Sequence, residues 1–258
     1  MLTRRHVLQA GLTTGCSVCA ALAFGTMSRG LAAPATAPTE IDGPGYRLRF
    51  IGSQRETIMM GNRAALLDLR TLKGQPHLYG IGPIEGLSGE VAIADSRPSL
   101  ARVGADKRAH VEESYEAGAP FFVWAEVPRW QDAPMPAQVR SFADLEAFIA
   151  EAGKTAALTQ AFPFVVRGRP ALIDFHIMDA KPETPPGMAE HQKMQIPFEL
   201  HTRQATLVGF WSNQHRGIFT PMGTNIHIHF QTPENDTSGH VQGLDLGQGG
   251  MVLSLPKG

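Results

Sequence analysis

Thiols and charged groups are scarce in this chain. Of its 258 residues only two are cysteines, Cys16 and Cys19, and both lie in an apolar segment near the N-terminus, where their spacing is more simply a coincidence than a redox or metal pair. The rest of the chain can form no disulfide, so a transition metal must be bound through histidine and carboxylate. Charged residues make up 18% and the formal charge is −1, which gives no electrostatic footprint for nucleic acid. The 43% of hydrophobic residues excludes disorder and is typical of a compact soluble enzyme or binding protein.

Residues 1–35 have the pattern of a secretory signal: a basic start, an apolar run through Phe24 and a small-x-small end at Ala33-Pro34-Ala35. The pair Arg4-Arg5 resembles the twin-arginine type of signal. A membrane anchor is the alternative, although the apolar run is short and diluted by glycine and threonine. We expect export to the periplasm and removal of this segment, after which 20 basic and 24 acidic residues leave a net charge of −4.

Strands dominate the predicted elements, in keeping with 27 glycines and 19 prolines. Apolar runs and period-two alternation predict strands at residues 46–51, 64–69, 91–94, 121–127, 162–166, 171–178, 205–211, 225–231, 240–246 and 251–255. A helical pattern covers residues 141–153, where Ser141 is a suitable N-cap, Leu145, Phe148 and Ile149 form an apolar stripe, and Gly153 ends the helix.

A helix between two groups of strands predicts an α+β fold. Residues 36–44, rich in alanine, proline and threonine, are expected to be a linker. Residues 45–155 would form an N-terminal domain, and residues 156–258 a β-rich, mostly antiparallel C-terminal domain that binds metal.

Three histidines follow a pattern that predicts a metal site. In a strand His227 and His229 point to the same face, while the intervening Ile228 points to the core. The segment Pro233–Gly239 has turn composition, so His240 opens the antiparallel neighbour. Three imidazoles from one hairpin match a catalytic zinc site with a position left for water or substrate, although other divalent metals suit the same ligands. Three surface histidines on a polar face are the alternative.

Other histidines lack this geometry, and we expect surface or hydrogen-bonded core positions for them: His77, His110, His176, His191, His201 and His215.

A second feature is a glycine-rich turn from Tyr79 that delivers Glu90 to the start of an apolar strand. Apolar neighbours disfavour the charged form of a carboxylate, which helps it to carry a proton. A structural turn with a solvated Glu90 is the alternative.

Taken together, these segments resemble the α-acetolactate decarboxylases, over roughly residues 56–246. The resemblance is carried by short stretches that follow the order of that family: Tyr79-Gly-Ile-Gly, Gly86-Leu-Ser-Gly-Glu90, Thr206-Leu-Val-Gly-Phe210, His227-x-His229 and Gly239-His240-Val241. It implies a zinc-dependent enzyme with a mixed-sheet α/β N-terminal domain and a β-rich C-terminal domain. It also implies that His227, His229 and His240 are the zinc ligands and that Glu90 is the active-site acid.

The sequence departs from the family pattern in three places. Pro83 stands where the family usually has a threonine. The family arginine before the Thr-x-Val-Gly-Phe strand aligns with Gln204, and Arg203, one residue earlier, points to the same face only if a bulge intervenes. The family takes a second glutamate from a C-terminal extension, whereas residues 241–258 contain no glutamate and Asp245 is their only acid.

The resemblance implies decarboxylation of a small 2-hydroxy-3-oxo acid, with Glu90 and Arg203 as catalytic residues and Zn²⁺, or another divalent metal, as cofactor. A metal would stabilise the enediolate, an arginine would hold the carboxylate, and an acid would deliver a proton. The alternatives are a related lyase or isomerase on another hydroxy-carbonyl substrate and a non-catalytic exported metal-binding module. We expect a small-molecule hydroxy-keto acid as partner, no nucleic acid and no stable membrane insertion after processing, and a homodimer is compatible with the pattern.

Overall fold

The structure, a computed structural model, describes residues 37–258. The expected signal at residues 1–35 lies outside the described residues. The strands are β1 (Thr39–Gly43), β2 (Tyr46–Ile51), β3 (Leu67–Asp68), β4 (Leu78–Pro83), β5 (Glu90–Ala94), β6 (Arg97–Val103), β7 (Ala109–Glu112), β8 (Gly118–Ala119), β9 (Phe122–Glu126), β10 (Trp130–Pro134), β11 (Phe162–Gly168), β12 (Leu172–Met178), β13 (Gln195–His201), β14 (Ala205–Trp211), β15 (Ile226–Gln231), β16 (Ser238–Asp245) and β17 (Val252–Pro256). The α-helices are α1 (Gln54–Met59), α2 (Phe142–Thr155) and α3 (Met188–Met194), with short 3₁₀ turns at Leu69–Leu72 and Glu85–Leu87. Over the same residues no helix combines the length and apolar character needed to cross a membrane.

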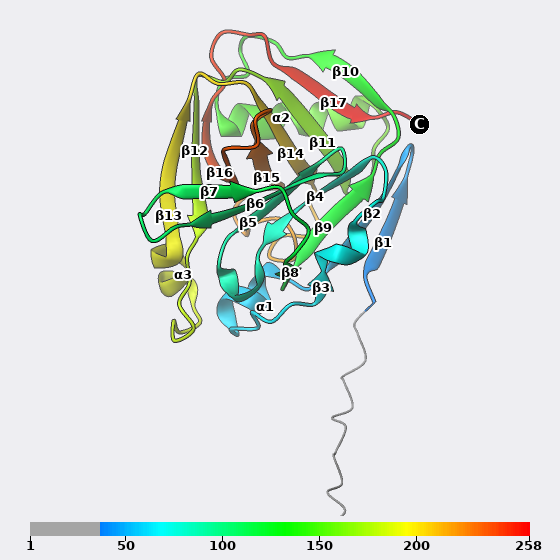
Figure 1. The fold of residues 1–258 in the computed structure, drawn as a ribbon. Coiled ribbons are helices and arrows are strands. Elements are labelled where there is room, and N and C mark those ends of the chain that lie inside the picture. The colour runs from blue at the N-terminus through cyan, green and yellow to red at the C-terminus, as the bar shows by residue number, and fades with distance from the viewer. Residues whose placement is uncertain (1–36) are drawn as a thin grey trace, which may run out of the picture. The chain divides into compact units, whose positions relative to one another are not determined.

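Two large sheets make up the fold (Figure 1). The first has the strand order β1-β2-β9-β4-β5-β6-β7, and the second has the order β10-β17-β11-β14-β15-β16-β12-β13. Every pair in the first sheet is antiparallel, so the expectation of a mixed N-terminal sheet is wrong. The reason is that tight connections join β4 to β5 and β5 to β6, whereas parallel neighbours need long crossovers. The predicted α+β class is confirmed.

The two sheets pack face to face and share one hydrophobic core. Strands β5 and β6 contact β12, β15 and β16 and run across them in the view of Figure 1. Leu48 and Val123 of the first sheet and Phe164 and Phe230 of the second are buried in the same cluster. The chain passes from one sheet to the other between β9 and β10. The domain division at residue 155 stays a prediction.

The segment expected to be a linker, residues 36–44, contains strand β1. Residues Thr39–Gly43 pair with β2 along its whole length. Composition did not predict this because an edge strand needs only its backbone groups to join a sheet. Residues 36–44 are therefore not simply a tether.

Helix α2 confirms the predicted helix and is bonded to the residues that precede β15. Ser141 caps it in a capping box with Asp144. Leu145 of this helix is buried in the core. On another face of α2 the Glu146 carboxylate accepts hydrogen bonds of 2.7 Å from the backbone N–H of Asn225 and from the Thr224 hydroxyl. These bonds fix the residues directly before β15.

Candidate active site

The three predicted histidines converge as the strand pattern indicates. His227 and His229 lie on β15, and His240 on β16 is the register partner of His229. The His227 Nε2 atom lies 3.1 Å from His229 Nε2 and 3.2 Å from His240 Nδ1. On the other face of β15, Ile228 is fully buried in the core. The hairpin therefore places three ring nitrogens around one point.

The protonation pattern of these rings suits a metal ion. The Nδ1–H group of His227 donates to the Phe219 carbonyl at 2.7 Å, which leaves a lone pair on Nε2. Burial lowers the pKa of His227 to about 4. Burial, together with the neighbouring imidazoles, also holds the pKa of His229 and of His240 well below the usual value. Neutral rings with inward lone pairs are the form in which imidazole binds metals.

The spacing of the nitrogens agrees with a shared ion. Zinc–nitrogen bonds of about 2.0–2.1 Å in a tetrahedral site place two ligand nitrogens roughly 3.4 Å apart. The distances of 3.1 and 3.2 Å around His227 Nε2 need only a small expansion to reach that value. The cluster of His227, His229 and His240 could therefore hold a metal ion.

Glu90, the first residue of β5, faces this cluster from the opposite sheet. Its carboxylate oxygens lie 3.7 Å from His229 Nε2 and 3.7 Å from His176 Nε2. Only 2% of the residue is exposed, so the alternative of a solvated glutamate is wrong. Burial raises the pKa of the Glu90 carboxyl well above its ordinary value. Burial therefore favours the protonated form of this carboxyl group beside the histidine cluster.

Close packing of the backbone requires glycine in the turn before Glu90. Gly89 has a φ of +157°, and a Cβ atom there would lie 2.4 Å from the Ala101 carbonyl oxygen. Gly86 has a φ of +72°, in the left-handed region that glycine adopts most readily. The turn brings the chain back so that Glu90 pairs with Pro83 across β4 and β5. Both residues line the same cavity.

His176 on β12 is a further buried histidine, and it lies at the site although the sequence did not predict it there. Its ring stacks on His240 with 4.5 Å between centroids. The two residues are register partners on β12 and β16. Burial lowers the pKa of His176 to about 3, and its Nδ1 atom has no hydrogen-bond partner among residues 37–258. His176 is a core residue with a side-chain hydrogen bond to Gln242, as one of the two expected positions allowed, but the pairing of β12 with β16 also places its ring against the hairpin, which was not expected.

A cavity of about 330 Å³ opens from the cluster to the surface. Its inner end is formed by Glu90, His176, His227 and His240, and α1, α3 and the Pro221–Gly223 segment supply much of the remaining wall. Ile58, Met178 and Met188 add apolar surface. Within the described part of the chain, neither lysine nor arginine lines the cavity.

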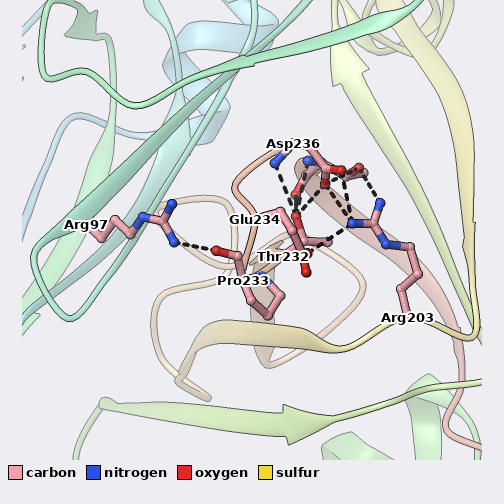
Figure 2. A network of polar contacts seen from close by, with 7 residues as sticks. Arg97, Arg203, Thr232, Pro233, Glu234 and Asp236 are labelled. Atoms are coloured by element: carbon pink, nitrogen blue, oxygen red, sulfur yellow. Dashed lines mark hydrogen bonds and ion pairs between the residues drawn. The ribbon is translucent and has the colours of Figure 1, made fainter.

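Arg203 lies elsewhere, so its predicted place in the active site is wrong. Its guanidinium binds the carboxylates of Glu234, at 3.0 Å, and Asp236, at 2.9 Å, in the turn between β15 and β16 (Figure 2). From the other sheet, Arg97 donates to the Pro233 carbonyl of the same turn at 2.6 Å. The register of β14 with β11 and β15 is continuous, so no bulge turns Arg203 toward the cavity. Arg203 instead holds the turn that places His240 beside His229.

The fold and the site together define an α+β protein of two packed antiparallel sheets, with a three-histidine cluster and a buried glutamate at one end of a cavity. Residues 50–255 match the family model described as alpha-acetolactate decarboxylase. The chain therefore belongs to the α-acetolactate decarboxylase family, whose activity is that of a carboxy-lyase.

Solved structures of α-acetolactate decarboxylases have the same fold as this chain. The chain resembles α-acetolactate decarboxylase from Bacillus subtilis strain 168, with a TM-score of 0.63 and 18% identity over 81% of this chain and 85% of that one. It also resembles a Staphylococcus aureus protein of unknown function described as similar to α-acetolactate decarboxylase, with a TM-score of 0.63 and 18% identity over 80% and 84% of the two chains. A search of the curated proteins found no match.

Proposed function

We propose that the protein is a zinc-dependent carboxy-lyase that decarboxylates a small 2-hydroxy-3-oxo acid. The observation that carries this proposal is the placement of a buried, proton-holding Glu90 against three neutral imidazoles at the inner end of a cavity. Membership of the decarboxylase family supports the reaction type. A divalent ion held by His227, His229 and His240 would supply positive charge to the oxygens of the substrate as carbon dioxide leaves.

The residues of the chain account for the remaining steps. Burial raises the pKa of the Glu90 carboxyl, and this group is placed to pass a proton to the carbon from which the carboxylate departed. The Phe219 carbonyl keeps the proton of His227 on Nδ1, so that Nε2 stays available. Apolar walls such as Ile58 and Met178 limit the water around the reacting atoms.

We propose that this active site lacks parts of the family machinery. Arg203 is engaged by Glu234 and Asp236, and within residues 37–258 no other side-chain cation lines the cavity to hold a carboxylate. This observation favours a second candidate function, a related metal-dependent lyase or isomerase whose hydroxy-carbonyl substrate carries no carboxylate.

Carbon dioxide release from racemic acetolactate tests the first proposal. Zinc-loaded native protein is compared with Glu90→Gln, with His227→Ala/His229→Ala, and with Glu112→Gln as an exposed control on β7. Glu90→Gln should keep its zinc and lose about 10²–10⁴-fold in turnover, the usual contribution of a general acid. The double variant should lose the metal, and Glu112→Gln should behave like the native protein.

Two outcomes contradict specific parts of this proposal. Release at the uncatalysed rate by zinc-loaded native protein would reject the decarboxylase and leave the second candidate function. Native turnover in Glu90→Gln would keep the enzyme and reject the role of Glu90.

A further inference from the structure

One wall of the cavity is a chain of uncharged polar side chains. Gln242 follows His240 by two residues on β16, and its Nε2 donates to Gln195 Oε1 at 3.0 Å. The Gln195 amide, at the start of β13, lies 3.2 Å from Nε2 of His191 on α3 and donates to it. These three residues, His191, Gln195 and Gln242, all line the cavity; we call them the amide wall.

The hydrogen bonds within the amide wall determine which of its N–H groups are already used. Burial and the nearby charge of Arg63 lower the pKa of His191 to about 4, so this ring is a neutral acceptor for Gln195. Each amide nitrogen carries two N–H groups, and each of these contacts uses one of them. Gln242 also makes a side-chain hydrogen bond with His176, so it is the second N–H of Gln195 that can serve a ligand beside Gln242.

The amide wall lies within reach of a molecule bound at the histidine cluster. Gln242 follows His240 by two residues along β16, and its side chain makes a hydrogen bond with His176, whose ring stacks on His240. The histidine cluster and the amide wall border the same cavity, because His240 and Gln242 both line it. A short substrate can therefore contact the cluster with one end and the amide wall with the other.

We propose that the amide wall is a subsite for an uncharged polar group, a hydroxyl or a carbonyl, on the end of the substrate remote from the reacting atoms. The proposal rests on the proposed function in one respect, that the reacting hydroxy-carbonyl unit lies at the histidine cluster. A methyl group at this end would make no hydrogen bond to the amide wall, whereas a hydroxyl or a carbonyl would, so the subsite discriminates in favour of the polar group. The subsite therefore favours a substrate with a hydroxyl or a carbonyl at this end, and it neither binds nor excludes the methyl ends of acetolactate.

Binding of two neutral four-carbon probes tests this subsite. Acetoin, 3-hydroxybutan-2-one, and erythrulose, 1,3,4-trihydroxybutan-2-one, share the hydroxy-ketone unit, but only erythrulose carries terminal hydroxyls. Calorimetry on zinc-loaded protein should show erythrulose binding about tenfold more tightly than acetoin, the ratio expected for about two added neutral hydrogen bonds. Equal affinities, or binding of neither compound, would overturn the subsite.

Leucine variants connect the preference to the amide wall. In Gln195→Leu and in Gln242→Leu the affinity ratio should fall toward one, because leucine has similar size and no polar group. Gln204→Leu, at an exposed position outside the cavity, is the matched control and should keep the tenfold ratio. Circular dichroism and zinc content verify that each variant is folded and loaded. An unchanged ratio in both cavity variants would also overturn the subsite, whereas the decarboxylase proposal is judged separately from carbon dioxide release.

Discussion

Acid should destabilise the metal-free protein steeply, because several imidazoles are buried in their neutral form. The pKa of His176 is about 3 and that of His227 about 4 in the folded chain, against an ordinary value of 6.5. Between pH 6.5 and pH 5 each ring takes up a proton only when the chain unfolds. The unfolded chain then binds more protons, so the free energy of unfolding falls as the pH falls.

The expected loss of unfolding free energy at acid pH is a large part of the total free energy of unfolding. The slope approaches about 1.4 kcal/mol per pH unit for each group once the pH is below 6.5, so His176 and His227 together remove about 3 kcal/mol between pH 6.5 and pH 5. His229 and His240 add to this loss, because the pKa of each is also well below 6.5. Domains of this kind unfold with a free energy of about 5–15 kcal/mol.

Chemical denaturation in the presence of a chelator, at several pH values from 5 to 7.5, measures the slope. His176→Gln should reduce the loss of unfolding free energy between pH 6.5 and pH 5 by about 2 kcal/mol, because it removes one proton-binding ring. His201→Gln, at an exposed position on β13, is the control and should retain the native slope. A native slope in His176→Gln would refute the argument that buried neutral histidines cause the acid sensitivity.

Three further predictions follow from other parts of the chain. Because burial raises the pKa of Glu90, the folded chain keeps a proton that the unfolded chain loses above about pH 4.5, so metal-free Glu90→Gln should gain stability over the native protein as the pH rises from 5 to 7.5 in denaturation curves. Ser141→Ala removes the N-cap of α2 and should lower the free energy of unfolding by about 1 kcal/mol in urea titrations. We propose export by the twin-arginine route, so replacing Arg4 and Arg5 with lysine should block it, and normal amounts of the variant in a periplasmic fraction would exclude that route.

The parts of the site that one strand or one hairpin determines could be predicted from sequence. His227 and His229 share a face because side chains alternate along a strand, and the short turn before His240 brings the third ring beside them. Helix α2 was predicted because its cap and its apolar stripe are local in sequence. In each case the signal comes from residues close together in the chain.

Parts that depend on distant pairing could not be predicted in the same way. The alternation of Ile173, Phe175 and Ile177 indicates that His176 lies on the opposite face of its strand, but not that β12 pairs with β16. Arg203 was assigned from an alignment offset, whereas its position is decided by two carboxylates some thirty residues later. Helix α3, which carries His191, has no apolar periodicity that would reveal it in a single sequence.

Strand β17 has a consequence for the time at which this fold can be completed. It lies between β10 and β11 in the second sheet, as Figure 1 shows for β10, although the chain reaches it only at Val252. Until that segment leaves the ribosome, the facing edges of β10 and β11 have no partner, and contacts between residues so far apart in sequence form slowly. Folding of the second sheet should therefore wait until β17 has left the ribosome, and a nascent chain stalled before residue 252 should expose two open strand edges to chaperones or to aggregation.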